Sequence, residues 1–439
     1  MRRLMRSWSL LILAAWACSL PGSEEVVDVA NSVAATLTAA ASGPTAPGPA
    51  ATNTAGPPTA TPPPPALRIV YLDAGNVMLI EGDAPPVALT GSGDGESLRI
   101  SDDGAKVAYT RRPSYSEAVE MRSVNVDGTG DMTLLSPAFL GGLYPLPTGT
   151  IDIDVSSFAF VPGTHTILFN TLAIPAEVGL YKFDDLLTLD ADTGMFRSLL
   201  EAGTGGDFSL SPDGSQMTIT RPGHIGLAHS DGTNLRADVV THPGVAANTE
   251  GAYYAGPSWA PDSSAAGVAI PSSDPFAPGA GGSIWILPAD GSPATHLADI
   301  TGDFFRGRGA ASALSPDLDR LGFTRPTATP TMSDLILANA DGTGEIVYGT
   351  GQIFWRGWSP DGIHFAYAYG PDMVLHIAAS GDNPVPLTTG RQLRWISATQ
   401  FLYLSGEYGT WILQLGEIGA ASIPLATPAG ELIAYDFDP

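Results

Sequence analysis

The chain has 439 residues and a formal net charge of −25, with 51 glycines, 38 prolines and a single cysteine. Charged residues make up only 15% of the chain and apolar residues 44%, which excludes a wholly disordered acidic polypeptide. The acidity argues against a nucleic-acid partner, and one cysteine excludes an intramolecular disulfide or a cysteine-type zinc site.

The first 17 residues are typical of a signal peptide. Three arginines within the first six residues precede an apolar run over residues 8–20, which is shorter than the roughly 20 residues of a membrane-spanning helix. Residues 15–18, Ala-Trp-Ala-Cys, resemble the cleavage box of bacterial lipoproteins, although the tryptophan is bulky for its position. The resemblance implies that Cys18 is lipidated and anchors an exported chain to the membrane. The alternative is an ordinary cleaved signal and a secreted protein.

Residues 18–65 predict the anchor cysteine followed by a spacer. Valine and leucine recur at helical spacing over residues 26–37, so a short helix is expected there. Residues 43–65 contain nine prolines among alanine, threonine and glycine. Because proline favours the extended polyproline conformation, this segment predicts a semi-rigid stalk of roughly 70 Å. The folded domain is expected over residues 66–439.

From residue 66 onward, two turn motifs recur. The first is an apolar residue followed by Ser-Pro-Asp-Gly and a β-strand, clearest at residues 210–214 and 358–362. Variants occur at residues 100–104, 160–163, 259–262, 314–317 and 396–399. The second is a tight Asp/Gly turn, a strong hairpin signal because its central positions need positive φ. It occurs at residues 81–83, 126–128, 192–194, 230–232, 289–291, 340–342, 380–382 and 416–417. Each pair of motifs predicts one four-stranded blade.

The two ends of the folded domain complement each other. The segment that begins at residue 66 lacks an opening strand, and residues 432–439 have the pattern of such a strand with the start of its Asp-Pro turn. Their pairing would complete an eighth repeat and remove exposed sheet edges. We therefore predict an all-β chain that forms an eight-bladed β-propeller closed by its terminal segments. Seven blades are the alternative.

These repeats resemble those of TolB-type β-propellers over essentially all of residues 66–439. The resemblance implies that the Pro-Asp-Gly residues form turns. It also implies that the residue before each serine, such as Trp259 or Trp358, packs between neighbouring blades. The resemblance concerns fold more than function, because propellers serve in binding, scaffolding and catalysis alike.

The loops of such a propeller divide between two faces. Strand direction alternates, so the Pro-Asp and Asp-Gly turns share one face, the short-turn face. The blade-to-blade connections and the loops between second and third strands share the other, the long-loop face, which we expect to bind ligand. These longer loops include residues 111–118, 171–182, 271–282 and 324–332.

Arginines and tyrosines on the long-loop face are the candidate site residues. Arg111, Arg221 and Arg325 each follow a threonine at the end of a second strand, and the planar arginine fork suits carboxylate or phosphate. The full candidate set is Arg111, Arg221, Arg325, Arg306, Arg308, Tyr253 and Tyr254. The alternative is that each arginine neutralises a nearby carboxylate of this acidic protein.

Familiar catalytic motifs are absent from the sequence. It contains no Gly-x-Ser-x-Gly nucleophile elbow, no His-Glu-x-x-His zinc helix and no phosphate loop. We expect no cofactor, no metal and no catalytic residues in a monomeric binding or scaffold module for an envelope protein or acidic glycan. The membrane is expected to be reached only through the lipid anchor. An extracytoplasmic polysaccharide lyase or hydrolase, with its site at the mouth of the central channel, is the alternative.

Overall fold

The computed structural model describes residues 66–113, 119–176, 181–246, 252–305, 311–407, 409–430 and 433–438. The predicted signal peptide, Cys18 and the stalk with its short helix lie outside these residues. The described chain is almost entirely antiparallel β-structure, with one four-residue helix, α1 (Pro137–Leu140). Its helical structure includes nothing of the length and apolar character required to span a membrane.

Four-stranded antiparallel units, the blades, follow one another along the chain; the innermost strand of each is named first. Blade 1 comprises β31 (Tyr435–Asp438), β1 (Arg68–Asp73), β2 (Asn76–Glu81) and β3 (Val87–Ala88). Blade 2 comprises β4 (Gly95–Ile100), β5 (Lys106–Arg111), β6 (Glu120–Asn125) and β7 (Met132–Leu135). Blade 3 comprises β8 (Thr150–Phe160), β9 (Thr166–Pro175), β11 (Leu186–Asp190) and β12 (Phe196–Leu200), with β10 (Tyr181–Lys182) paired to the end of β9. Blade 4 comprises β13 (Asp207–Leu210), β14 (Gln216–Arg221), β15 (His224–His229) and β16 (Arg236–Thr241).

Blades 5–8 form the second half of the ring. Blade 5 comprises β17 (Ser258–Trp259), β18 (Ala265–Pro271), β19 (Gly281–Pro288) and β20 (Thr295–Thr301). Blade 6 comprises β21 (Arg320–Pro326), β22 (Ser333–Asn339) and β23 (Ile346–Gly351), and a bridge from Leu314 to Leu321 occupies its innermost position. Blade 7 comprises β24 (Ile353–Trp358), β25 (His364–Tyr369), β26 (Val374–Ala379) and the first half of β27 (Val385–Trp395). Blade 8 comprises the second half of β27, β28 (Gln400–Ser405), β29 (Ile412–Glu417) and β30 (Ile423–Ala426).

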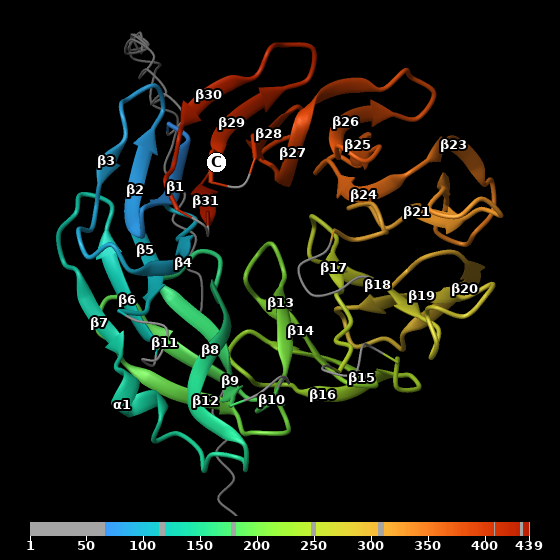
Figure 1. Cartoon of the computed structure of the whole chain (residues 1–439). Coiled ribbons are helices and arrows are strands. Elements are labelled where there is room, and N and C mark those ends of the chain that lie inside the picture. The colour runs from blue at the N-terminus through green and yellow to red at the C-terminus, as the bar shows by residue number, and fades with distance from the viewer. Residues whose placement is uncertain are drawn as a thin grey trace, which may run out of the picture. The chain divides into compact units, whose positions relative to one another are not determined.

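Strand β27 belongs to two blades at once. It pairs with β26 up to Thr389 and with β28 from Gly390 onward, so one continuous seven-stranded sheet divides into two blades. The described residues therefore form eight blades, arranged in a ring (Figure 1). This confirms the predicted all-β propeller and decides between eight blades and seven.

The ring is closed by the C-terminal strand. Residues Arg68–Tyr71 of β1 pair in antiparallel register with Tyr435–Asp438 of β31, which lie beside each other in blue and red in Figure 1. The buried carboxylate of Asp436 adds two side-chain links. It accepts a hydrogen bond from Ile100 N of blade 2 at 3.1 Å and lies 2.6 Å from Arg394 of blade 8. One side chain thus joins the closing strand to both neighbouring blades.

A repeated hydrogen-bond network holds the Ser-Pro-Asp-Gly turns. Ser211 Oγ donates to Asp213 Oδ1 at 2.6 Å and accepts from Gln216 N at 2.9 Å. Gly214 completes the turn at φ +70°, a backbone conformation that side chains disfavour. The same serine–aspartate hydrogen bond occurs at Ser101–Asp103, Ser315–Asp317 and Ser359–Asp361.

Tryptophans before these turns join neighbouring blades, as the family resemblance implied. Trp259 Nε1 of blade 5 donates to Ser209 O of blade 4 at 3.0 Å. Trp358 Nε1 of blade 7 donates to Ala313 O in the segment that leads into blade 6, at 2.9 Å.

Two details of the sequence prediction are wrong. The loop expected at residues 171–182 is largely strand, because β9 continues to Pro175 and β10 folds back on it, with Lys182 opposite Leu172. The turn expected at residues 416–417 lies later, at 418–420. Gly416 is in the strand because of packing: an added Cβ would lie 2.2 Å from the ring of Phe401.

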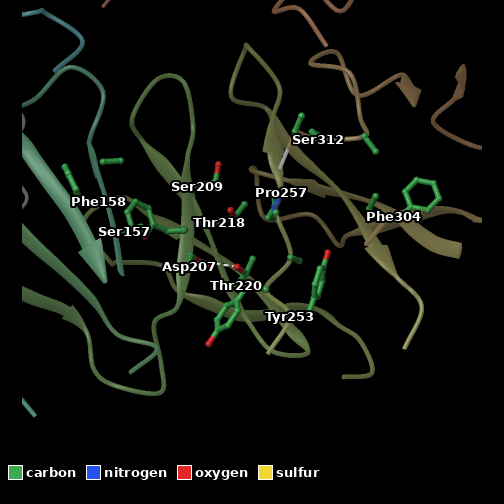
Figure 2. Close-up of a pocket in the computed structure, with 18 of the residues that line it drawn as sticks. Ser157, Phe158, Asp207, Ser209, Thr218, Thr220, Tyr253, Pro257, Phe304 and Ser312 are labelled. Carbon is green, nitrogen blue, oxygen red and sulfur yellow. Dashed lines mark hydrogen bonds between the residues drawn. The ribbon is translucent and has the colours of Figure 1, made fainter. Parts of the chain in front are cut away.

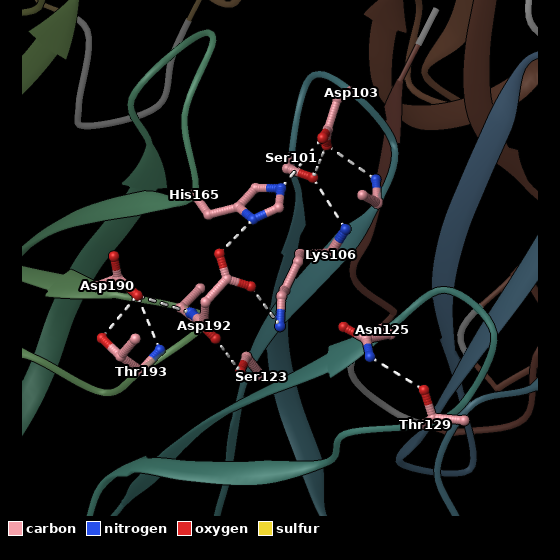
Figure 3. Close-up of polar contacts among 12 residues, drawn as sticks. Ser101, Asp103, Lys106, Ser123, Asn125, Thr129, His165, Asp190, Asp192 and Thr193 are labelled. Atoms are coloured by element: carbon pink, nitrogen blue, oxygen red, sulfur yellow. Dashed lines mark hydrogen bonds and ion pairs between the residues drawn. The ribbon is translucent and has the colours of Figure 1, made fainter.

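Blades 2 and 3 are joined on the short-turn face by His165 (Figure 3). Its Nδ1 lies 2.7 Å from Asp192 Oδ2 and its Nε2 lies 3.1 Å from Asp103 Oδ2. Lys106 Nζ adds an ion pair to Asp192 at 2.9 Å. Burial opposes protonation of His165, but the hydrogen bonds and charges of Asp192 and Asp103 outweigh it and raise the pKa of the imidazole above 6.5.

Removing the carboxylate of Asp436 should weaken ring closure. We expect Asp436→Ala to lower the free energy of unfolding by about 2 kcal/mol, because Ile100 N and Arg394 both lose a charged partner. Asp436→Asn should lose less, since its amide oxygen can still accept from Ile100 N. Urea denaturation measures the difference, with the exposed Asp372→Ala as the charge-matched control. Equal stability of wild type and Asp436→Ala would contradict this role.

The His165 contact should make stability depend on pH. A raised pKa in the folded state stabilises the protein fully below the ordinary histidine value, and this contribution is lost as the pH rises through the raised pKa. We expect the difference in Tm between wild type and His165→Gln to shrink by about 1–2 °C between about pH 6 and about pH 8.5. Calorimetry checks this. His229→Gln is the control, because among the described residues the side chains that the His229 ring hydrogen-bonds, Thr233 and Asn234, belong to its own turn, and its difference from wild type should change less with pH.

Candidate functional site

A cavity of about 300 Å³ lies among segments of five consecutive blades (Figure 2). Its walls come from innermost strands β4, β8 and β13, from β14 and β18, and from the connections that lead into blades 5 and 6. Innermost strands of successive blades can border one space only at the middle of the ring. We call this space the central cavity.

Aromatic rings and hydroxyl groups dominate the lining. The aromatic residues are Phe158, Phe208, Tyr253, Tyr254 and Phe304, and the hydroxyl residues are Ser157, Ser209, Thr218, Thr220 and Ser312. The hydroxyl of Thr218 is buried and makes no hydrogen bond within the described structure. Buried polar groups are normally hydrogen-bonded, so a ligand atom that bonds Thr218 would satisfy it. The size and lining are those of a small-molecule site.

A polar cluster forms one wall of the central cavity. Lys182 Nζ pairs with Asp207 and lies 4.0 Å from the ring centre of Tyr254. Asn170 Nδ2 also donates to Asp207, at 3.0 Å, and the Tyr254 hydroxyl donates to Asp184 at 2.7 Å. Asp207 and Tyr254 line the cavity, and β10 and the loop after it supply Lys182 and Asp184. The hairpin extension of blade 3 therefore brings this cluster to the long-loop end of the cavity.

Burial changes the acid–base character of this wall. It raises the pKa of Asp184, and the hydrogen bond from Tyr254 and the charge of Lys182 oppose it without cancelling it. The neighbouring Asp185 also has a pKa raised by burial, although the backbone N and hydroxyl of Thr171 both donate to it. These carboxyl groups hold a proton more readily than an exposed aspartate. The described residues contain no group of three or more His, Cys, Asp or Glu side chains placed to hold a metal ion.

The structure brings together the aromatic part of the candidate set. Tyr253 and Tyr254 both line the central cavity, and the ring of Tyr253 lies 5.7 Å from that of Phe305. Arg306 and Arg308 lie outside the described residues.

The three described arginines of the set lie on different blades, and each contacts partners close to it. Arg111 Nε lies 3.3 Å from Asp94 and 3.4 Å from Glu120. Arg325 binds both oxygens of Glu345, at 2.9 and 2.7 Å. Arg221 donates to Gly203 O at 2.5 Å. Carboxylates thus neutralise Arg111 and Arg325, the alternative that the sequence left open.

Few signals in the sequence pointed to the residues of the cavity wall. Lys182 stands two residues before the Asp184–Asp185 pair, and this short charged run at the end of a long loop is the one available signal. Asp207 and Thr218 carry none, because one opens a strand and the other lies within one. They line the same cavity as Tyr254 because the ring brings their segments together.

No family model and no curated protein sequence matches the chain. Among solved structures it is similar to TolB from Acinetobacter baumannii, with 12% identity over 84% of this chain and 66% of that chain and a TM-score of 0.36. It is also similar to oligogalacturonate lyase from Vibrio parahaemolyticus (13% identity, 69% and 82% of the two chains, TM-score 0.43). A third similar structure is the β-propeller domain of the Trilobed protease from Pyrococcus furiosus (14%, 77% and 98%, TM-score 0.42). These similarities concern the fold alone, and the strand pairing of this chain establishes its propeller independently.

Proposed function

We propose that this protein is a surface-tethered, extracytoplasmic propeller that binds a glycan or an envelope protein through its long-loop face, with the central cavity as the binding site. The observation that carries the proposal is the lining of that cavity. Aromatic faces pack against the apolar faces of sugar rings, and hydroxyl groups exchange hydrogen bonds with sugar hydroxyls. Tyr253, Tyr254 and Thr218 supply both kinds of contact, so the lining favours a short sugar segment.

The tether rests on the sequence. The lipoprotein-like box that ends at Cys18 supports a lipid anchor, and the proline-rich residues 43–65 support a stalk of roughly 70 Å. Such a stalk would carry the propeller away from the membrane surface, where the cavity is accessible to ligands of the cell envelope.

Filling the central cavity should abolish binding. Gly256 lines the cavity, and a Cβ added there meets no atom within 4 Å, so Gly256→Trp can occupy the space without backbone strain. We expect this variant to lose at least about tenfold in affinity for whichever oligosaccharide or envelope protein the wild-type whole chain retains in a binding screen.

Gly244→Trp is the matched control. Gly244 belongs to the same connection and, like Gly256, is exposed with open space around an added Cβ, but it lies outside the cavity. Both variants should keep the wild-type Tm. Unchanged retention of Gly256→Trp would overturn the assignment of the cavity as the binding site.

A second candidate is an extracytoplasmic polysaccharide lyase or hydrolase. The observation that favours it is the hydrogen bond from the cavity-lining Tyr254 to Asp184, a carboxyl group whose pKa is raised by burial, since perturbed carboxyl groups beside a cavity are typical of acid–base catalysis.

Tyr254→Phe tests the enzyme candidate. It removes the hydroxyl that donates to Asp184 and retains the ring over Lys182. Cleavage of acidic and neutral polysaccharides by the whole chain, followed as new reducing or unsaturated ends, should fall by about 100-fold or more in this variant. The exposed Tyr181→Phe should keep wild-type activity. Absence of cleavage by the wild type would leave the binding function as the conclusion.

A further inference from the structure

Three aromatic rings lead from the central cavity to the long-loop face of blade 5. The ring centre of Tyr253, which lines the cavity, lies 5.7 Å from that of Phe305. The ring centre of Phe305 lies 5.2 Å from that of Phe276. Tyr253 is buried, Phe305 is half-buried and Phe276 is exposed, so accessibility increases outward from the cavity. We call these three residues the aromatic row.

Phe276 is held in place although its side chain is exposed. It lies in the loop between β18 and β19, where its backbone N donates to Asp274 Oδ1 at 3.1 Å. The connection that leads into blade 5 braces the same loop, because Ala246 N donates to Ser273 O at 2.7 Å. The ring packs edge-to-face against Phe305, with an angle of 63° between the two ring planes. The loop therefore presents the ring of Phe276 at a defined position beside the cavity.

The exposed ring of Phe276 offers a narrow apolar surface. With 69% of its surface exposed, it is the most exposed large apolar side chain of the described residues. Burying a phenylalanine side chain is worth about 1.5–3 kcal/mol, and most of that gain is left for a ligand. The flanking residues 272–275 and 277–280 are serine, aspartate, proline, alanine and glycine. A stable protein interface buries about 800 Å² on each partner, so this narrow surface favours a slender ligand over a protein.

The charges beside the aromatic row disfavour an acidic ligand. Three segments carry or adjoin the row: residues 242–257, 272–280 and 302–313. Among the described residues of these segments, the charged side chains are Asp274 and Asp303, and both are exposed. Burial lowers the pKa of His242, whose ring lies 6.5 Å from that of Tyr253, so the imidazole adds no positive charge near neutral pH. The field beside the row and the net charge of −25 both repel anions.

We propose that the aromatic row is a second subsite for an uncharged oligosaccharide, one part of which occupies the central cavity while its outer sugar units stack on Phe276. Aromatic faces pack against the apolar faces of sugar rings. A ligand in the cavity must pass two ring-to-ring steps, of 5.7 and 5.2 Å, to extend from Tyr253 to Phe276, so a chain of several sugar units is required. This inference rests on the proposed function and adds the length and the charge of the ligand.

The test compares long and short sugars by titration calorimetry of the whole chain. We expect at least one of cellohexaose, chitohexaose and mannohexaose to bind at least about tenfold more tightly than its disaccharide. Phe276→Ala should lose at least about fivefold in affinity for that hexasaccharide and keep the wild-type affinity for the disaccharide. Phe276→Tyr retains the ring and should bind as the wild type does. Phe139→Ala is the matched control, because Phe139 is also exposed and packs edge-to-face on one phenylalanine, Phe196, outside the row.

The outcomes separate this inference from the proposed function. If Gly256→Trp abolishes hexasaccharide binding and Phe276→Ala leaves it unchanged, the cavity stands as the binding site and the aromatic row is overturned as a subsite. Equal affinity for hexasaccharide and disaccharide would overturn the row as well. Tighter binding of hexagalacturonate would overturn the assignment to an uncharged ligand. Loss of retention of an envelope protein by Phe276→Ala, with hexasaccharide binding intact, would assign the row to a protein partner instead.

Discussion

Pairing of β31 with β1 is the interaction on which the rest of the molecule depends. Without it, blade 1 would lack its innermost strand and would expose an open sheet edge. Asp436 extends the closure from the backbone to both neighbouring blades. Because the ring is closed, innermost strands that are far apart in the sequence border a common centre. The central cavity arises from this convergence.

The acidic residues of the chain serve different purposes on the two faces. On the short-turn face many are built into turns, where hydrogen bonds from Ser211 and Ser215 lower the pKa of Asp213 to about 2. On the long-loop face, Asp94 neutralises Arg111 of the same blade. Much of the negative charge is therefore structural.

Local signals carried most of the fold prediction. The Ser-Pro-Asp-Gly turns are stabilised by hydrogen bonds within six residues, so each copy could be recognised without knowledge of its surroundings. Prediction was wrong where packing overrides such signals: Gly416 stays in a strand against Phe401, and β9 extends into an expected loop. In the site, aromatic residues near blade junctions pointed to Tyr253 and Tyr254. The partners of each arginine could not be predicted, because they depend on loop conformation.

The sequence alone determined the all-β repeat architecture and the complementarity of its two terminal segments. It could do so because turn chemistry and strand alternation are properties of neighbouring residues. Only the tertiary structure decided which side chains share a cavity, which arginines are neutralised and which remain without a counter-charge. Those outcomes depend on contacts between segments that a ring brings together from different blades, as with Lys182 of blade 3 and Tyr254 in the connection that leads into blade 5. A linear sequence carries no local signal for such contacts.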